Sequence, residues 1–303
     1  MRKQPADLAA SVSRRLLNLA RAQAEDYNLV LIRYACERLL YRLSISPYAD
    51  RFVLKGALLF ALWTGHMHRP TRDLDMLGMG DVSSEALVSV FRALCHIPVE
   101  PDGLQFDADA IRVEPIREEQ EYQGSRVHLS AAMGTAIIAV HVDVGVGDTV
   151  VPLPEKARYP TLLDFPVPQL RVYPKEAVVA EKLHAMVTLG MLNSRMKDFY
   201  DLWVMARQFP FDGALLVKAV TATFTRRGAP LPVNEPVALT DEFALDPLKQ
   251  TQWRAFLNRS RLDVNAPQLA EVVEELRAFL LPLIVAAHKT GFNRRWLPGG
   301  PWR

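Results

Sequence analysis

The sequence contains only two cysteines, Cys36 and Cys95, and they do not form a C-x-x-C motif. This scarcity excludes a disulfide framework and is typical of a reducing compartment, so we expect a cytoplasmic location. Long apolar runs are also absent. The amino-terminal segment has charges spaced throughout, and no stretch approaches the roughly 20 charge-free residues of a membrane span. We therefore expect neither export nor membrane insertion.

A large excess of charge of one sign is missing as well. The formal net charge is +2, so the molecule is not a polycation, and contact with nucleic acid must come from a local basic patch. Half of the residues are apolar, which allows a sizeable core in one large or two smaller domains. We find no repeat and no low-complexity tract, apart from a Gly-, Pro-, Trp- and Arg-rich tail at 291–303, which we expect to be mobile. A monomer is the default expectation.

Hydrophobic spacing predicts helices first and then a sheet. Apolar residues recur at intervals of three and four over 8–43, which predicts two amphipathic helices. The same spacing in VLKGALLFALWTG predicts a helix that ends at Gly65. The Ser pair of SSEALVSVFRALCH, followed by Glu85, is typical of a helix start. Strand-like alternation follows in DAIRVEPIREE, GSRVHLSAAM and TAIIAVHVDVGVGD, so we expect a sheet built around 71–150.

The rest of the chain is predicted to be mostly helical. The Pro-rich segment 151–174 is interpreted as a surface loop or a linker between domains. From Lys175 onward helical spacing dominates again. We therefore expect an α+β protein with an amino-terminal helical region at 1–50, a sheet-containing core at 51–170 and a helical carboxyl-terminal domain at 171–303.

Two aspartates stand one residue apart in RPTRDLDML. In a strand, residues i and i+2 point to the same face, so Asp73 and Asp75 would project together. Two carboxylates this close repel each other, and a divalent cation, a basic side chain or open water must offset their charge. For an isolated D-x-D, the ordinary explanation is a solvated turn in which Arg69 and Arg72 are the partners.

A third carboxylate favours a functional reading. Alternation in AIIAVHVDVGVG places the valines on one face and His141, Asp143 and Gly145 on the other, so Asp143 lies in an otherwise very apolar strand. A lone buried Asp is costly. If this strand neighbours the one that carries Asp73 and Asp75, three carboxylates converge, as two Mg²⁺ ions about 4 Å apart require when they clamp a transferring phosphate. His141 would then lie near the site.

A glycine opens the helix that precedes the D-x-D. Backbone N–H groups at such a helix start can hold a phosphate, so Lys55 and Gly56 are candidates for a phosphate turn. A helix cap is the commoner explanation of a Lys-Gly pair. Its place shortly before the D-x-D is what makes it informative.

The chain presents, in this order, a Gly with a small residue, a helix, a D-x-D and a third Asp on a later strand. This pattern resembles the nucleotidyltransferase superfamily that includes DNA polymerase beta. More narrowly, FVLKGALLF with RPTRDLDML, HVDVGVGD and AEKLHAMVTLGMLNSRMKDFYDLW look like the AbiEii/AbiGii family of toxin nucleotidyltransferases. The resemblance covers about 16–281. It implies a polymerase-beta-like nucleotidyltransferase core, a mixed sheet with helices, followed by a helical domain. It also implies a type IV toxin–antitoxin or phage-defence role, with a cognate antitoxin.

The resemblance assigns roles to individual residues. The family's metal-ligating aspartates fall on Asp73, Asp75 and Asp143, which would bind Mg²⁺ or Mn²⁺ and align the α-phosphate of a nucleoside triphosphate. The second family signature, a lysine-bearing helix followed by R-x-K-D-x-x-D-L, falls on Lys182, Arg195, Lys197, Asp198 and Asp201. The lysine and the first aspartate of that signature are the members essential to activity, so Lys182 and Asp198 join the predicted catalytic set.

The chemistry of this second block agrees with such a role. Lys182 on a helix can meet a triphosphate as a point charge, and Arg195, Asp198 and Asp201 lie three apart on one helix face. The alternative is a salt-bridged surface pair above a core that includes Phe199. We expect Lys182 and Asp198 to belong to the site.

The sequence departs from the superfamily at the phosphate turn. Gly-Ser or Gly-Gly is usual there, whereas Gly56 is followed by Ala57, which has no hydroxyl to reach a phosphate. The backbone amides remain available. The predicted nucleotide-binding residues are therefore Lys55, Gly56, Ala57, Arg69, Arg72, Lys182, Arg195, Lys197 and Asp201.

The expected reaction is transfer of a nucleoside monophosphate from the triphosphate to an acceptor hydroxyl, with loss of pyrophosphate. The toxin resemblance implies an RNA acceptor, most plausibly the 3′ end of a tRNA. Two alternatives stay open: an antibiotic-like small molecule as acceptor, and a degenerate protein that binds without catalysis. His66 and His68 could be imagined as a metal pair, but exposed loop histidines are the better explanation.

Overall fold

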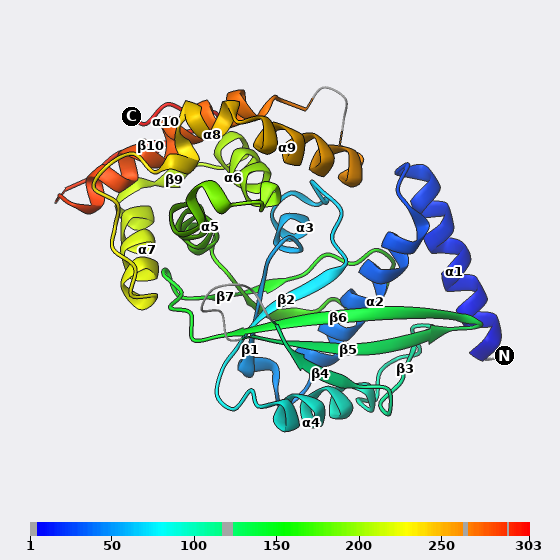
Figure 1. Ribbon diagram of the computed structural model, residues 1–303. Coiled ribbons are helices and arrows are strands. Elements are labelled where there is room, and N and C mark those ends of the chain that lie inside the picture. The colour runs from blue at the N-terminus through cyan, green and yellow to red at the C-terminus, as the bar shows by residue number, and fades with distance from the viewer. Residues whose placement is uncertain (1–4, 117–123, 263–265, 290) are drawn as a thin grey trace. The chain divides into compact units, whose positions relative to one another are not determined.

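The computed structural model describes residues 5–116, 124–262, 266–289 and 291–303. Contacts divide the chain into two compact units. The first unit comprises 1–147 and 155–172, and the second comprises 148–154 and 173–303. Among the described residues, no helix is both long enough and apolar enough to cross a membrane. Figure 1 gives the element labels that are used below.

The first unit contains a mixed sheet. Its helices are α1 (Pro5–Ala22), α2 (Tyr27–Ser44), α3 (Leu59–Thr64) and α4 (Ser84–Cys95). Its strands are β1 (Phe52–Lys55), β2 (Asp73–Gly78), β3 (Gln105–Phe106), β4 (Arg112–Pro115), β5 (Gly124–Met133), β6 (Ala136–Val146), β7 (Glu155–Arg158) and β8 (Gln169–Val172). The strand order is β3-β5-β6-β2-β1-β8-β7, and β4 pairs with β5. Figure 1 labels these strands except β8.

The centre of the sheet combines both strand directions. β2 lies parallel to β6 and antiparallel to β1, while β5 and β6 form a long antiparallel hairpin. Helix α2 packs on β6, and α4 packs on β4, β5 and α2. Val140, Val142 and Val144 are completely buried in β6, whereas the residues between them are half-buried. The predicted alternation of this strand and the expected mixed sheet with helices are therefore confirmed.

The predicted helix over 53–65 is wrong in its first part. Phe52–Lys55 form strand β1, in which Phe52, Val53 and Leu54 are all buried, so both faces of the strand are covered. A short apolar run of this kind cannot be distinguished from a buried helix by periodicity alone. Helix α3 begins only at Leu59, and it ends as predicted at Gly65, whose φ of 81° is left-handed. Ser83 caps α4 as expected, since its hydroxyl accepts a hydrogen bond from Ala86 N.

The Pro-rich segment 151–174 is not a simple linker loop. It contributes β7 and β8 to the sheet, and its prolines at 152, 154, 160, 166, 168 and 174 all lie outside these four-residue strands. Proline lacks the N–H that a strand ladder needs, but it does not disturb a strand that it only flanks. Between the strands, Leu162 N donates to Glu37 Oε2 over 2.7 Å, and Arg38 Nη1 donates to Pro166 O over 2.9 Å.

A buried charge network lies beneath this segment. Arg38 and Arg42 on α2 both bind the carboxylate of Asp102, with distances of 3.2 and 2.7 Å. Tyr34 donates to the backbone oxygen of Asp102 over 2.6 Å. These four residues are at most 4% exposed, so the network ties α2 to the loop before β3 from inside the core. Sequence periodicity did not reveal it, because its members look like the polar side of an amphipathic helix.

The second unit is built mainly from helices. They are α5 (Lys175–Leu189), α6 (Met196–Gln208), α7 (Gly213–Arg226), α8 (Asp241–Leu245), α9 (Pro247–Ser260) and α10 (Leu269–Ala287), with 3-10 turns at Gly190–Leu192 and Val237–Leu239. Two short strands, β9 (Phe211–Asp212) and β10 (Arg295–Trp296), pair antiparallel. Helices α5 and α7 pack on each other, and α10 packs on α6 and α7.

The carboxyl-terminal tail is ordered, in contrast to the prediction of mobility. The indole N–H of Trp296 donates to Ala206 O over 2.6 Å, and that of Trp302 donates to Phe279 O over 2.9 Å. Both rings also pack against the Phe279 ring, with centroid separations of 4.8 and 5.9 Å. Two anchored tryptophans outweigh the conformational freedom that the surrounding Gly and Pro residues suggest.

Candidate active site

The aspartate pair lies at the start of β2. The burial pattern of β2 alternates at this point, with Leu74 and Met76 buried and Asp73 and Asp75 half-buried. The two carboxylates therefore project from one face of the sheet, as the sequence spacing predicts.

The third carboxylate lies on the neighbouring strand. In the parallel ladder between β2 and β6, Asp75 is the partner of Asp143, and Asp73 is the partner of His141. The structure thus brings the three predicted aspartates together on one face of two adjacent strands in the first unit. His141 is also close, as expected, because its Nδ1 lies 3.6 Å from Asp73 Oδ1.

Arg126 on β5 is a member of this group that sequence reasoning missed. Its Nε and Nη2 donate to the two oxygens of Asp143, each over 2.7 Å. Its Nη2 also lies 4.0 Å from Asp73 Oδ2. The hydrogen bonds to Asp143 raise the pKa of the Arg126 guanidinium, although partial burial opposes the shift. The third carboxylate is therefore held by a bidentate ion pair, which is the strongest geometry of its kind.

A signal for Arg126 was present in the sequence. The β5–β6 hairpin pairs Met133 with Ala136 next to its turn, and counting back along both strands places Arg126 opposite Asp143. The same register places His128 opposite His141, and their rings lie 4.9 Å apart. The alternation was read in each strand separately, and the register between the two strands was not followed.

Strand β1 brings a lysine and a glycine to the carboxylates. Lys55 is the antiparallel partner of Asp75. Gly56 has a φ of 78°, and a Cβ atom at this position would lie 2.0 Å from Asp75 Oδ2. Glycine is thus required here twice, by the left-handed backbone and by the close approach of the Asp75 carboxylate. Ala57, the predicted departure from the superfamily, is buried.

The chemistry of this group suits a hard cation, but its present geometry is not a finished metal site. Carboxylate oxygens are the ligands that Mg²⁺ prefers, and Asp73 and Asp75 present them from one strand. Within the part of the chain that the structure describes, however, no three Asp, Glu, His or Cys side chains gather closely enough to hold a metal ion. Arg126 binds both oxygens of Asp143, so Asp143 does not present them to a shared cation.

The second family signature forms a charge cluster in the second unit. Lys182 on α5 donates to Asp198 Oδ1 over 2.6 Å and to Asp201 Oδ2 over 2.9 Å. Arg195, at the start of α6, donates from Nε to Asp198 Oδ2 over 2.7 Å. The two carboxylate side chains are only 2% exposed, so this is a buried cluster and not the surface pair of the alternative reading. Lys197 points outward and is exposed.

The two cations control the ionisation of Asp198. Burial alone raises the pKa of this carboxyl, but the nearby charges of Lys182 and Arg195, together with the hydrogen bond from Lys182, outweigh burial. The pKa of Asp198 is therefore held well below its usual range, and the side chain stays ionised in the cluster.

The remaining predicted residues precede β2. Arg69 Nη1 donates to Pro70 O over 3.4 Å, and Arg72 is exposed. His66 and His68 are ring neighbours with centroids 4.6 Å apart, and the His68 ring packs edge-on against Phe60 at 5.2 Å. Both histidines lie in a loop as expected, but only His66 is exposed, and His68 is half-buried.

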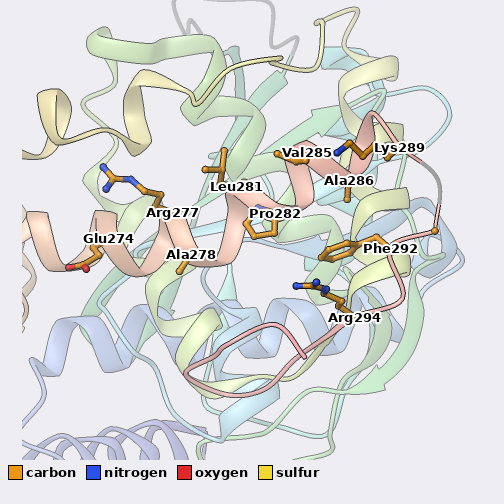
Figure 2. A pocket seen from close by; sticks show the side chains of 11 residues that line it. Glu274, Arg277, Ala278, Leu281, Pro282, Val285, Ala286, Lys289, Phe292 and Arg294 are labelled. Atoms are coloured by element: carbon orange, nitrogen blue, oxygen red, sulfur yellow. The ribbon is translucent and has the colours of Figure 1, made fainter.

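A cavity of about 810 Å³ lies elsewhere, in the second unit, along α10 and the segment that follows it (Figure 2). Leu281, Pro282 and Phe292 give it a largely apolar wall. Arg277, at one end, already binds Glu235 and Asp241, each over 2.7 Å. The residues that line this cavity do not include a member of the predicted catalytic set, so we do not include the cavity in the candidate active site.

The mixed sheet, the glycine turn and the acidic residues on one face of two adjacent parallel strands match the architecture that the sequence resemblance implies. Two crystal structures from Helicobacter pylori have a similar fold. JHP933 is 13% identical with a TM-score of 0.51, over 87% of this chain and 94% of that chain. A protein provisionally assigned as a nucleotidyltransferase is 14% identical with a TM-score of 0.50, over 88% of this chain and 100% of that chain.

The family follows from the sequence match. Residues 38–275 match the family described as "Nucleotidyl transferase AbiEii toxin, Type IV TA system", and the chain belongs to this family. It is accordingly a nucleotidyltransferase of the AbiEii toxin family, as the sequence motifs predict. No curated protein matches the chain.

Proposed function

We propose that this protein is a metal-dependent nucleotidyltransferase toxin that transfers a nucleoside monophosphate from a triphosphate to the 3′ end of a tRNA. The observation that carries the proposal is the register of Asp75 with Asp143 on adjacent parallel strands, with Asp73 on the same face. Carboxylates in this arrangement are what cation-assisted transfer of a phosphoryl group requires.

The metal site would be formed by Asp73, Asp75 and Asp143. A bound Mg²⁺ or Mn²⁺ would neutralise charge on the α-phosphate and on the leaving pyrophosphate. Without the metal ion, the Arg126 guanidinium offsets the charge of Asp143 through two hydrogen bonds of 2.7 Å. For Asp143 to take part, its carboxylate must turn away from Arg126, and the freed guanidinium then has a phosphate oxygen as its natural partner.

The residues around the carboxylates would position the triphosphate. Lys55 lies beside Asp75 across the β1–β2 ladder, where its ammonium can contact a phosphate as a point charge. Gly56 lets the backbone approach closely, since a side chain here would collide with Asp75. In the absence of a hydroxyl at Ala57, the backbone N–H groups of this turn are the remaining donors. The assignment of Arg69 and Arg72 to phosphate binding stays a prediction.

Lys182 and Asp198 remain in the proposed catalytic set through the family signature. The cluster holds the Lys182 ammonium between two carboxylates, at 2.6 and 2.9 Å, so its orientation is fixed. Arg195 adds a second cation, and its side chain is 37% exposed. We propose Arg195 and Lys197 as the outward-facing cations of this block, with Asp201 as a support for Lys182.

A labelling experiment tests the function. The purified protein and its Asp75→Asn variant are incubated with total tRNA and each α-labelled nucleoside triphosphate, with Mg²⁺ or with a chelator. We expect label on tRNA only with the unmodified protein and only with the metal ion. Label in the presence of the chelator would overturn the metal dependence. Label on an aminoglycoside but on no RNA would replace tRNA by a small-molecule acceptor.

The stability of the variant is the control. Asp and Asn have nearly the same volume, and the substitution removes one of two neighbouring like charges. We therefore expect the melting temperatures of the two proteins to agree within a few degrees. A large drop would show that Asp75 is structural and that lost labelling says nothing about catalysis.

The biological setting belongs to the proposal as well. The family is one of type IV toxin–antitoxin systems, so we propose that a cognate antitoxin opposes this toxin and that the pair acts in phage defence. Growth arrest on expression of the unmodified protein, but not of the Asp75→Asn variant, is the expected outcome. Equal arrest by both would separate toxicity from nucleotidyl transfer.

A further inference from the structure

A basic pocket in the second unit shares Arg195 and Lys197 with the second family signature, but its wall on α9 has no role in the function proposed above. It has a volume of about 450 Å³ and lies between the start of α6 and one side of α9. Gln252, Phe256 and Arg259 line it from α9, with the spacing of a single helical stripe, and Arg195 and Lys197 line it from the α6 side.

The pocket is positively charged. Arg195, Lys197 and Arg259 line it, and its wall contains no Asp or Glu side chain. Lys197 and Arg259 are exposed, so their charges face the solvent of the pocket mouth. Helix α9 itself, PLKQTQWRAFLNRS, carries basic residues and no acidic one. In a chain with a net charge of only +2, this is the kind of local basic patch that contact with nucleic acid requires.

An aromatic ring lies beside the cations. Phe256 is half-buried, and its ring centroid lies 5.6 Å from that of Trp253 and 5.7 Å from that of Tyr200. Trp253 in turn is fixed by a hydrogen bond from its indole N–H to Pro267 O over 3.0 Å. The Phe256 ring is thus supported from behind, which makes it a rigid platform for stacking.

A buried lysine holds the two walls together. Lys249 Nζ donates to Asn193 O over 3.0 Å and to Gln252 Oε1 over 3.3 Å. Asn193 Oδ1 also accepts a hydrogen bond from Arg195 N over 2.8 Å. The first turn of α9 is thereby tied to the segment that positions Arg195, so the pocket is part of the rigid fold.

We propose that this pocket binds single-stranded RNA, with one base stacked on Phe256 and adjacent phosphates on Lys197 and Arg259. The proposal rests on the RNA acceptor of the proposed function. A nucleoside triphosphate fits less well, because it binds as a complex with Mg²⁺ and the pocket wall has no carboxylate to coordinate that ion. A polynucleotide needs only cations for its backbone and a ring for a base.

Two arginines of α9 provide a matched pair for the test. Arg259 lines the pocket, whereas Arg254 is exposed outside it and bonds to its own helix at Gln250 O over 3.3 Å. Affinity for a fluorescent single-stranded RNA that ends in the tRNA acceptor sequence is measured by anisotropy, without triphosphate, at several salt concentrations. We expect Arg259→Ala to weaken binding about fivefold and to reduce the salt slope by about one, and Arg254→Ala to change affinity less than twofold.

The stacking platform is tested in the same assay. Phe256→Leu keeps an apolar side chain in the aromatic cluster but removes the π face, and we expect about a tenfold loss of RNA affinity. Melting curves of all variants verify that the fold is kept. If Phe256→Leu proves unstable, the comparison of Arg259→Ala with Arg254→Ala is the test of the proposal.

The outcomes separate this inference from the proposed function, since binding is measured without catalysis. Equal effects of Arg259→Ala and Arg254→Ala, or no effect of either, would contradict RNA binding in this pocket, even if the unmodified protein labels tRNA. Displacement of the fluorescent RNA by free triphosphate at lower concentrations than by unlabelled RNA would overturn it as well, in favour of a nucleotide site. Selective loss with Arg259→Ala and Phe256→Leu supports it, even if no transfer to tRNA is found.

Discussion

Arg126 binds both carboxylate oxygens of Asp143 from the neighbouring strand, with two hydrogen bonds of 2.7 Å. The pair is partly exposed, because the side chains of Arg126 and Asp143 are 34% and 19% accessible. The guanidinium also lies 4.0 Å from Asp73. It therefore occupies a position in which it competes with any cation for the same acidic group.

The first prediction concerns this competition. Arg126→Gln removes the positive charge and the bidentate pair, so both oxygens of Asp143 become available to a divalent ion. We expect Mn²⁺ to bind roughly tenfold more tightly, since hydrogen bonds between charged groups contribute about 1.5 to 3 kcal/mol. Affinity is measured by calorimetry or by the Mn²⁺ resonance signal, without triphosphate or RNA.

A control residue lies on the same sheet. Arg112, on β4, is the ladder partner of His128 and is exposed. Arg112→Gln removes the same charge without touching Asp143, and we expect less than a twofold change in Mn²⁺ affinity. Weaker Mn²⁺ binding by Arg126→Gln would mean that Arg126 orients Asp143 for the metal and does not compete with it.

The second prediction uses two glycines with nearly the same backbone. Gly56 and Gly65 have φ values of 78° and 81°, but a Cβ at Gly56 would lie 2.0 Å from Asp75 Oδ2, whereas nothing lies within 4 Å at Gly65. Gly65→Ala should cost about 1 kcal/mol of unfolding free energy through backbone strain alone. Gly56→Ala should cost at least about 1 kcal/mol more, because Asp75 must also move.

Denaturant unfolding of both variants gives the difference directly. The same two proteins are also compared for Mn²⁺ affinity, which should fall in Gly56→Ala and stay unchanged in Gly65→Ala. Equal destabilisation of the two variants would show that the Asp75 carboxylate relaxes freely, so Gly56 would not be needed for its placement.

Much of this geometry could be predicted from local patterns. Alternation within β2 and β6 was sufficient to place Asp73 and Asp75 on one face and Asp143 on the polar side of its strand, and both expectations are confirmed. The adjacency of the two strands was a condition that the sequence alone did not establish. The β2–β6 ladder meets it.

Other features depend on tertiary structure and were missed or misjudged. Arg126 requires the register between two strands, and β1 was predicted as helix because a strand buried on both faces lacks alternation. The tail looked mobile by composition, but Trp296 and Trp302 bury against Phe279. In each case the deciding partner lies on another element, and neither propensity nor periodicity within one element reveals that contact.

The third prediction concerns a buried acid on α2. Burial raises the pKa of Glu37 to about 7, although the hydrogen bond from Leu162 N and the charge of Arg38 oppose the shift. An acid whose folded-state pKa lies above its unfolded value of 4.5 contributes stability that is present at low pH and is lost as pH rises through about 7. The loss amounts to about 3 kcal/mol.

Glu37→Gln resembles the protonated acid at every pH. The unfolding free energy of the unmodified protein should therefore fall relative to that of Glu37→Gln between pH 5 and 8, by about 2 to 3 kcal/mol. Urea unfolding at intervals across this range measures the difference. A difference in unfolding free energy that does not change with pH would show that Arg38 and Leu162 keep Glu37 ionised throughout. The pKa of Glu37 would then not be raised.

The last prediction separates structure from chemistry in the second family signature. Lys182 balances two carboxylates that are each only 2% exposed, at 2.6 and 2.9 Å, so Lys182→Met leaves them facing each other without their shared cation. We expect a loss of about 3 to 5 kcal/mol of unfolding free energy at pH 7.

The stabilising effect of the low Asp198 pKa is present above pH 4 and is lost as pH falls, so the unmodified protein should weaken in acid. In Lys182→Met the main opposing charge is gone, burial then raises the pKa of Asp198, and acid should partly restore stability. If Lys182→Met instead unfolds like the unmodified protein at pH 7 but fails to label tRNA, the lysine acts on the substrate and is dispensable for the fold.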